Sequence, residues 1–294
     1  MIAVPGTFTD WIEQSHGDDG REWLASLPDT FADLCRRWDL APDGELRHGG
    51  KSLVLPVRAS AGPAALKVTW MGPTTREEVA ALRHWDGRGM VRVLRDDPAV
   101  GALLLERLDA EPLLADVPND EAARIFGHLI RTQSVPAMPG LTRVEAALAE
   151  LAGNLPGFWE EVDRPYSRDV LDRSLALASE LQWSGRPRMV NCDLYDDNVL
   201  WSGQHGHWVA IDPWPMAGDP EYGVAQLLWR RVDRMQSVAD VDRFLAILCD
   251  AGQLDPDLTR ACAWIRITDY WLWALGNGLT EDPRRCARLL EWLG

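Results

Sequence analysis

Residues 189–201, MVNCDLYDDNVLW, set a cluster of polar side chains between two apolar runs. The cluster holds three aspartates and two asparagines within eight positions. A solvated turn accounts for one or two of these carboxylates, because turns favour Asp and Asn. Asp193 lies closest to the strand-like residues before the cluster, so a turn explains it least well. It is therefore a candidate for chemistry.

A β-hairpin is predicted immediately after this cluster. The runs VLW at 199–201 and WVAI at 208–211 are apolar, and the turn residues GQHG lie between them. We expect Trp201 to pair with about Trp208, which sets the register of the two strands.

This register brings two oxygen-bearing side chains together at the open end of the hairpin. Asn198 falls opposite Ile211 or Asp212, so Asn198 and Asp212 are expected to lie side by side. Such a pair suits Mg²⁺, which binds one or two carboxylates or amides together with water and substrate phosphates. A third carboxylate nearby, that of Asp193, can act as a general base or orient a nucleophile. The alternative is a hairpin whose acidic ends simply face water.

The rest of the chain predicts two lobes of different kinds. A helical leader over residues 1–40 precedes four strand-like runs and one short helix, and helical periodicity dominates from about residue 120. The predicted fold class is α+β, with a small β-rich lobe at 1–108 and a larger helical lobe at 109–294. The strands are expected at 46–58, 61–70, 90–97 and 99–108, and the helices at 74–85, 120–133, 142–155, 168–182, 225–232, 240–252 and 258–276.

Composition narrows the class of protein and its partners. The 294 residues are 46% hydrophobic and 26% charged, as in ordinary soluble globular enzymes. The net charge of −15 opposes nucleic acid and favours cationic partners, although acidity also serves solubility. With no apolar run of about 18 residues, no membrane partner is predicted. Oligomeric state is left open.

The N-terminal sequence and the cysteines predict a cytoplasmic location. The chain does not begin with a basic segment followed by an apolar block, as a secretory signal would. The five cysteines are scattered without CxxC spacing, which argues against a disulfide framework or a zinc site. A reducing compartment is the simplest setting for them.

The motif that begins at Asp193, D-L-x-x-x-N followed by a strand and I-D, resembles the catalytic signature of the aminoglycoside phosphotransferases, relatives of the protein kinases. Other blocks agree in their order: AALKV before a helix, LLLERL at the connector, and GDP after the hairpin. Within that family the chain is most similar to the streptomycin 6-kinase (aminoglycoside/hydroxyurea resistance kinase) group, over nearly its whole length. The resemblance implies a two-lobed, protein-kinase-like fold.

The resemblance also implies how ATP or GTP would be bound. Lys67, in AALKV, would contact the α- and β-phosphates, with Glu78 as its ion-pair partner. Ser52, in GGKS, would lie under the phosphates. Backbone groups of Glu106 and Leu108 would meet the base.

For the reacting groups, the resemblance assigns Asp193 as the base that accepts or orients the proton of the substrate hydroxyl. Asn198 and Asp212 would hold Mg²⁺ on the nucleotide phosphates. These groups fit the chemistry, because phosphoryl transfer needs positioning and charge neutralisation more than covalent help.

Structural roles compete with some of these assignments. Glu78 also fits a capping box that begins at Thr75, and Lys67 could extend along apolar surface to reach water. Asp219, in GDP, could bond to the backbone of the catalytic loop or cap the helix that follows.

The substrate is expected on an acidic, aromatic-lined surface of the helical lobe, because antibiotic kinases of this kind accept polar, often polycationic molecules. Tryptophans at helical spacing are more often core, so that interpretation stays open for Trp264, Trp271 and Trp273. The candidate contacts are Asp196, Asp197, Trp214, Asp269, Trp273 and Asn277, of which the last three share one helical face at i, i+4 and i+8.

Two positions depart from the family's catalytic loop. That loop usually has one histidine two residues before the catalytic aspartate and another two residues after it, where this chain has Asn191 and Tyr195. Neither position supplies the base or a metal ligand, so catalysis is still expected. Loop packing and the shape of the acceptor pocket are expected to differ.

The predicted function is an antibiotic-inactivating kinase that transfers the nucleotide γ-phosphate to a hydroxyl of a small polar antibiotic, first of all a streptomycin-like aminoglycoside. The same chemistry on a nucleoside, peptide or other antibiotic is the alternative. A binding module with a degenerate kinase fold would be expected to lose Asp193, Lys67 or a metal ligand, and all are present. A metal-dependent phosphohydrolase would not need the GGKS, Lys67 and connector blocks.

Overall fold

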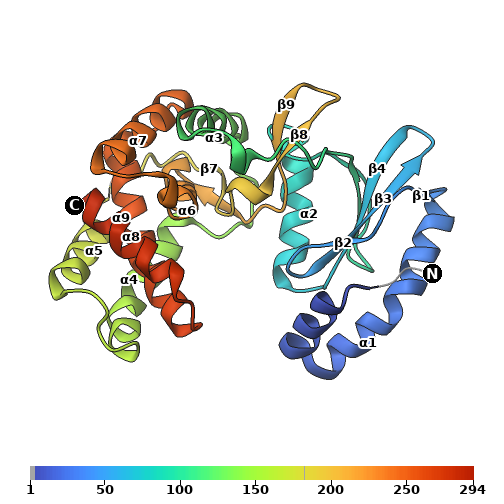
Figure 1. Cartoon of the computed structure of the whole chain (residues 1–294), viewed down its shortest axis with the longest axis horizontal. Helices are drawn as coiled ribbons and strands as arrows, with labels where there is room; N and C mark the ends of the chain where they lie inside the picture. The colour runs from blue at the N-terminus through green and yellow to red at the C-terminus, as the bar shows by residue number, and fades with distance from the viewer. Residues whose placement is uncertain (1–3, 182) are drawn as a thin grey trace. The chain divides into compact units, whose positions relative to one another are not determined.

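The computed structural model describes the chain except for residues 1–3 and 182 and the side chains of residues 73 and 74 (Figure 1). The chain divides into two compact units. One comprises Met1–Gly87 with Val91–Asp109, and the other comprises Arg88–Met90 with Ala110–Gly294.

The smaller unit is an antiparallel sheet covered by a long helix. The strand order is β1–β3–β4–β6–β5, and β2 also pairs with β3. The run predicted at 46–58 is split into two strands, because the GGK segment forms a turn in which the Gly49 N–H donates to the Ser52 carbonyl at 2.9 Å. The elements are α1 (Gly6–Trp38), β1 (Ala41–Pro42), β2 (Arg47–His48), β3 (Ser52–Ala59), β4 (Gly62–Thr69), α2 (Pro73–Trp85), β5 (Val93–Asp97) and β6 (Ala102–Glu106).

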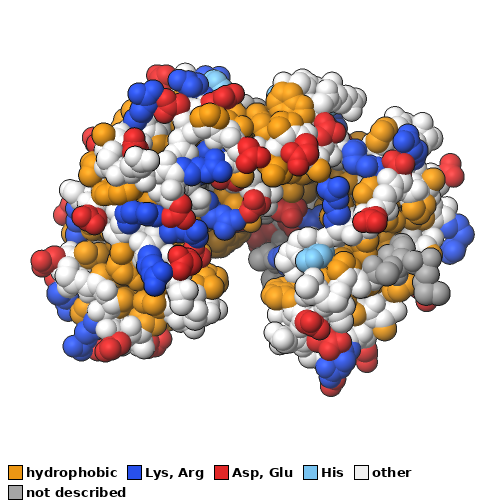
Figure 2. Space-filling view, viewed as in Figure 1, with side chains coloured by type: hydrophobic (Ala, Val, Ile, Leu, Met, Phe, Trp, Pro, Cys, Tyr) orange, Lys and Arg blue, Asp and Glu red, His pale blue; other side chains and the backbone are white. Residues whose placement is uncertain are grey.

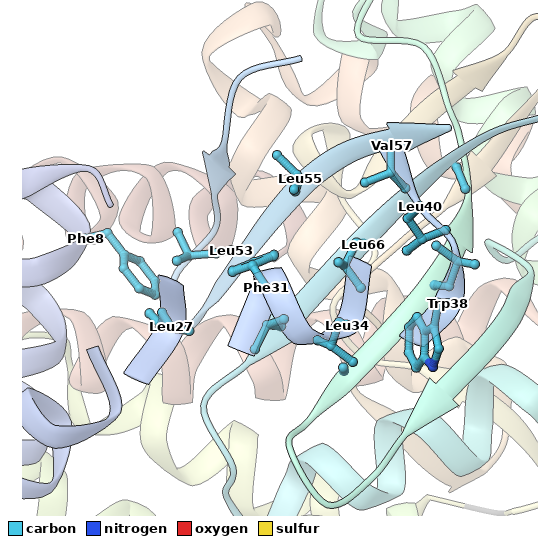
Figure 3. Packing of buried hydrophobic residues seen from close by; sticks show 14 of the residues in the cluster. Phe8, Leu27, Phe31, Leu34, Trp38, Leu40, Leu53, Leu55, Val57 and Leu66 are labelled. Atoms are coloured by element: carbon cyan, nitrogen blue, oxygen red, sulfur yellow. The ribbon is translucent and has the colours of Figure 1, made fainter. Parts of the chain in front are cut away.

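Helix α1 packs its apolar face on this sheet (Figure 3). Phe31 and Leu34 of α1 lie against Leu53 of β3 and Leu66 of β4, and all four side chains are fully buried. Burying side chains of this size contributes about 1.5–3 kcal/mol each. The helix bends at Gly17, whose φ of 58° is one that glycine adopts at little cost. The packing fixes β4, the strand that carries Lys67.

The larger unit is mainly helical and holds two small antiparallel sheets, β7–β10 and β8–β9. Its 3-10 helices are η1 (Leu114–Asp116), η2 (Asp196–Asn198), η3 (Pro220–Val224) and η4 (Val232–Arg234). Its strands are β7 (Arg188–Asn191), β8 (Val199–Ser202), β9 (His207–Ala210) and β10 (Pro215–Gly218). Its α-helices are α3 (Asn119–Gln133), α4 (Val144–Glu161), α5 (Arg168–Glu180), α6 (Ala225–Arg231), α7 (Val238–Gly252), α8 (Pro256–Gly276) and α9 (Glu281–Leu293).

Four elements of this unit differ most from the sequence prediction. Helix α4 continues through Pro156 to Glu161, although a proline inside a helix removes one backbone hydrogen bond. Strand β10 contains a proline and a glycine, which both disfavour strands, and its pairing with β7 overrides that preference. Helix α9 begins within the turn-like sequence NGLTEDP and was not expected. The helix predicted at 168–182 ends at Glu180, and residue 182 lies outside the described residues.

The surface carries charges of both signs (Figure 2), and four of the five cysteines are buried. Acidic and basic side chains are interspersed over the face of the molecule drawn in Figure 2. Each of the five cysteines is free. Burial raises the pKa of the Cys192 thiol to about 11, so a packing role fits this residue better than redox chemistry. Among the described helices, none is long and apolar enough to cross a membrane.

Candidate active site

A buried ion pair joins the sheet to the helix in the smaller unit. Lys67 Nζ on β4 lies 2.7 Å from Glu78 Oε1 on α2, and the two side chains are only 4% and 9% exposed. Lys67 pairs with Val54 of β3 on one side and Leu103 of β6 on the other, so the sheet fixes its backbone. The predicted ion pair is confirmed. An unpaired charge in its place would be costly, because neither group could be solvated.

Thr75, and not Glu78, closes the start of α2. The Thr75 hydroxyl accepts a hydrogen bond from the Gly72 N–H at 3.1 Å and donates to the Trp70 carbonyl at 3.1 Å. Helix α2 begins at Pro73, so Glu78 lies beyond the first turn and its carboxylate is directed to Lys67. The capping-box interpretation of Glu78 is therefore wrong.

The other residues assigned to the nucleotide lie at strand ends of this unit. Ser52 is buried and begins β3, directly after the GGK turn. Glu106 ends β6, where its N–H donates to the Arg92 carbonyl at 3.0 Å and its carboxylate accepts from the Arg92 N–H at 2.8 Å. Leu108 follows and is half-buried. Because the N–H of Glu106 is already used, any contact from this residue to a base would come from its carbonyl oxygen.

In the larger unit, Asp193 lies in the turn after β7, and both of its carboxylate oxygens accept hydrogen bonds. Asn198 Nδ2 donates to Oδ2 at 2.9 Å, and Gln226 Nε2 donates to Oδ1 at 2.7 Å. Burial raises the pKa of Asp193, while these two bonds oppose the rise and the negative charge of Asp212 adds to it. The carboxylate is thus held in one orientation in a partly desolvated setting, which suits a general base.

The β8–β9 hairpin has the predicted register. Trp201 pairs with Trp208, and the Ile211 N–H donates to the Asn198 carbonyl at 2.9 Å. Asp212 follows with a φ of 48°, in the left-handed region that aspartate tolerates better than most residues. Asn198 and the residue before Asp212 are therefore bonded at the open end of the hairpin.

This end of the hairpin offers donors of the kind that Mg²⁺ accepts. The amide nitrogen of Asn198 donates both to the Asp193 carboxylate and to the Asp193 carbonyl, so the amide oxygen is the atom left to act as a ligand. The carboxylate of Asp212, the other predicted ligand, would supply a second oxygen. Within the described part of the chain, no group of three or more His, Cys, Asp or Glu side chains is placed to hold a metal. Mg²⁺ at this end would therefore need water and substrate phosphates as its remaining ligands.

The two residues at which this chain departs from the family's loop, Asn191 and Tyr195, both hold the loop in place. Asn191 Oδ1 accepts from the Asp193 N–H at 3.1 Å and from the Trp214 N–H at 3.2 Å, which links the loop to the segment after the hairpin. The Tyr195 ring lies against the guanidinium of Arg230, 4.7 Å from the ring centroid. Asn191 and Tyr195 thus tie the loop to its neighbours through an amide and an aromatic face.

Two arginines of helix α6 bind the carboxylates of Asp196 and Asp197, which were expected to contact the substrate. The buried Arg231 donates to Asp196 from Nε at 2.9 Å and from Nη2 at 2.6 Å. Arg230 forms an ion pair with Asp197, whose side chain is 62% exposed. The carboxylate of Asp196 is therefore used inside the protein, where it anchors the loop.

Asp196→Ala is expected to lower the free energy of unfolding by about 3–5 kcal/mol, because it leaves the buried Arg231 guanidinium without its counter-ion. Asp197→Ala is the matched control, since it removes an exposed ion pair from the same loop and should cost about 0–1 kcal/mol. Chemical denaturation of both variants measures the difference. Equal stability of the two would show that Arg231 does not depend on Asp196.

Asp219 has a different partner from either of those expected. Its carboxylate accepts hydrogen bonds from the Ser184 N–H at 2.7 Å and from the Ser184 hydroxyl. It makes no side-chain cap to the helical turn that follows it. Both sequence interpretations of Asp219 are wrong, because the segment before β7 packs against this position.

The remaining substrate candidates lie in the larger unit with different degrees of exposure. Trp214 and Trp273 are 52% and 55% exposed, whereas Trp264 is buried. Trp273 is thus not a core residue, although the core interpretation holds for Trp264. Asn277 follows the last residue of α8, and its Nδ2 donates to the Trp273 carbonyl at 2.8 Å.

Asp269 is a half-buried carboxylate one helical turn before Trp273. Burial raises the pKa of Asp269, and the positive charge of Arg266 opposes the rise. Between them in the chain, Tyr270 stacks on Trp229 at 4.2 Å and on Trp273 at 5.5 Å between ring centroids. A carboxylate and an exposed aromatic face therefore lie together on α8, a combination that suits a cationic ligand.

The sequence prediction missed Gln226, Arg230 and Arg231, the three residues of α6 that hold the loop. The run AQLLWRRV was expected to be a helix, and it is one. Two adjacent arginines in so apolar a run were the available signal, because an arginine that is buried with the helix needs a partner.

The family model for aminoglycoside/hydroxyurea antibiotic resistance kinases matches residues 37–274 of this chain. The chain belongs to this family. It is a kinase, and its family is one of antibiotic resistance.

Curated relatives of this kinase agree over most of their lengths. The streptomycin 6-kinase of Streptomyces griseus is 35% identical over 286 residues, which cover 95% of this chain and 93% of that protein. The hydroxyurea phosphotransferase of Kitasatospora aureofaciens is 33% identical over 298 residues, which cover 100% of this chain and 86% of that protein.

Solved structures agree with the protein-kinase-like fold. The aminoglycoside phosphotransferase APH(4)-Ia, in a ternary complex with ADP and hygromycin B, matches with a TM-score of 0.60 and 18% identity, covering 89% of this chain and 97% of that one. The choline kinase LicA from Streptococcus pneumoniae matches with a TM-score of 0.60 and 14% identity, covering 92% and 99%. At these identities the matches show the fold alone, and they confirm the predicted fold class.

Proposed function

We propose that this kinase transfers the γ-phosphate of ATP or GTP to a hydroxyl of a small polar antibiotic, and that its acceptor is a streptomycin-like aminoglycoside. The observation that carries the proposal is the Asp193 carboxylate, held on both oxygens in a turn beside Asn198. A carboxylate fixed in this way can take the proton of an attacking hydroxyl without having to reorient.

The metal ligands in this proposal are Asn198 and Asp212. Mg²⁺, when bound, would neutralise charge on the transferring phosphate. Asn198 would have two functions at once, because its amide nitrogen orients Asp193 while its amide oxygen faces the cation. A substitution at this position would therefore disturb both the base and the metal.

Lys67 carries the nucleotide half of the proposal. Its ammonium, oriented by Glu78, would contact the α- and β-phosphates, and Ser52 would lie beneath them. Backbone groups of Glu106 and Leu108 would meet the base. The ADP in the APH(4)-Ia complex supports a nucleotide as a ligand of this fold.

The acceptor would lie against Trp214 and the face of α8 that carries Asp269 and Trp273, with Asn277 and Asp197 beside them. The half-buried carboxylate and the exposed rings suit the amino or guanidino groups of an aminoglycoside. Two relatives named as streptomycin 6-kinases support the choice of antibiotic. Asp196 is left out of this surface, because its carboxylate binds Arg231. Its role in this proposal is to hold the loop.

A panel of acceptors tests the proposal. The protein is incubated with Mg²⁺ and ATP or GTP in the presence of streptomycin, hygromycin B, hydroxyurea, a nucleoside antibiotic or a peptide antibiotic, and products are identified by mass spectrometry. We expect streptomycin to gain one phosphoryl group. Phosphorylation of another member would replace the acceptor but keep the chemistry. Nucleotide hydrolysis without a phosphorylated antibiotic would contradict the kinase assignment and favour a phosphohydrolase.

A further inference from the structure

Gln226 makes a direct contact with the candidate base, although nothing in the sequence motif includes it. Its Nε2 donates to Asp193 Oδ1 at 2.7 Å. The residue lies at the start of α6, and it is separated from Asp193 by 33 positions in the chain. A hydrogen bond to an ionised carboxylate is charge-assisted, and it is stronger than a hydrogen bond between neutral groups.

The two donors to Asp193 come from different elements. Asn198 belongs to the same short loop as the base, five positions further along the chain, whereas Gln226 belongs to a helix. With one donor alone, the carboxylate could turn about its Cβ–Cγ bond at the cost of a single local contact. With a second donor on the other oxygen, any rotation breaks a bond to a separate element.

Helix α6 is a firm support for such a contact. Leu227 and Leu228, which follow Gln226, are fully buried. Arg231, at the end of the helix, is itself buried and bonds to the carbonyl of Leu114 at 2.7 Å as well as to Asp196. The helix that carries Gln226 is therefore fixed both by apolar packing and by hydrogen bonds to other parts of the unit.

We propose that Gln226 is a positioning residue, which holds Asp193 in the orientation that accepts the proton of the substrate hydroxyl. This inference rests on the proposed role of Asp193 as the base. An ionised carboxylate has about four lone-pair sites, so each oxygen keeps capacity to accept a further proton or hydrogen bond when both amides are bound. Gln226 thus restrains the base without occupying it.

The kinetic test compares Gln226→Met, which keeps the length of the side chain but removes the donor, with Gln226→Glu, which places a like charge beside Asp193. Streptomycin is the acceptor, or else the antibiotic that the panel identifies. We expect kcat to fall about 10–100-fold in both variants, the loss that one hydrogen bond to a charged group represents. The KM values for nucleotide and acceptor should stay within about twofold. Gln236→Met, at an exposed glutamine, is the control with unchanged kcat.

A spectroscopic test reads the contact without any acceptor. The side-chain amide resonance of Gln226 is identified by its loss in Gln226→Met, and it is then compared in the wild-type protein, Asp193→Ala and Asp172→Ala. We expect the resonance to move, and its exchange with water to speed up, in Asp193→Ala but not in Asp172→Ala. Melting curves of each variant show whether the fold persists.

The two tests separate the inference from the function on which it rests. An unmoved Gln226 resonance in Asp193→Ala, or a kcat unchanged in both Gln226 variants while Asp193→Ala is inactive, would overturn the positioning role alone. Full activity of Asp193→Ala would overturn the base itself. A rise in KM with kcat unchanged would assign Gln226 to ligand binding instead.

Discussion

Asp193→Asn is expected to lower kcat for phosphoryl transfer by about 100–10,000-fold, the range that a positioned acid–base group contributes. Asparagine keeps the size of the side chain but cannot accept the proton of the substrate hydroxyl. Nucleotide binding should persist, because the groups assigned to it are other residues. Transfer is measured by mass spectrometry of the phosphorylated antibiotic, and nucleotide affinity by calorimetry.

The control for this variant is Asp172→Asn, which neutralises an exposed aspartate of α5 that pairs with Arg168. It should retain wild-type kcat, because an exposed pair at i, i+4 contributes little to the fold. Asp193→Asn with wild-type kcat would remove the proposed mechanism. Loss of nucleotide affinity together with kcat would instead indicate damage to the fold.

The Asp193 carboxylate also predicts how activity changes with pH. A base must be ionised to act, so kcat/KM should fall as pH falls through the pKa of Asp193. Because burial raises that pKa, the fall should begin at a higher pH than the ordinary value of an aspartate would give. The folded-state pKa is the raised one, so the ionised group costs stability. The cost in folding free energy is absent below the unfolded-state pKa of Asp193. It grows as the pH rises through that value and is complete above the folded-state pKa.

The sequence predicted the parts of the site that depend on local order. Alternating apolar residues and a short turn are enough to define a hairpin, and the pairing of Trp201 with Trp208 then follows. That register places Asn198 next to Ile211, so the open end of the hairpin was predictable to one residue. The pairing of Lys67 with Glu78 was what the resemblance to the kinase family implied, and the structure contains it.

The contacts that hold the loop around Asp193 could not be predicted in the same way. They join Asp193 to Gln226 and Asp196 to Arg231, which are more than 30 positions apart in the chain. Periodicity shows that α6 is a helix, but it does not show which element its polar side chains meet. Asp196 was therefore predicted to contact the substrate because it lies near the motif. In the folded chain its carboxylate binds the buried Arg231 instead.

Asn191 shows a further limit of the same kind. Its difference from the family's histidine was visible in the sequence, but its effect depends on the backbone N–H groups of Asp193 and Trp214, and Trp214 lies 23 positions after Asn191. One amide oxygen receives both. The Nδ2 of Asn191 is buried and has no hydrogen-bond partner among the described residues. The side chain therefore holds the loop through its amide oxygen alone. Asn191 thus ties the loop to the segment after the hairpin.

Lys67→Met is expected to abolish transfer and also to lower the free energy of unfolding by about 3–5 kcal/mol, because the Glu78 carboxylate is left buried without its partner. Loss of activity in this variant alone would not separate a nucleotide contact from a damaged fold. Denaturation of Lys67→Met gives the stability term, and transfer to the antibiotic gives the catalytic one.

The double variant Lys67→Met/Glu78→Met separates the two. A buried ion pair replaced by apolar residues of similar volume is often neutral or stabilising, so most of the lost stability should return. Activity should not return, because the ammonium proposed to contact the phosphates is still missing. Two buried methionines between β4 and α2 would then hold the sheet against the helix in an inactive protein. Recovery of activity together with stability would show that Lys67 serves the fold alone, and that the phosphates are held by other groups.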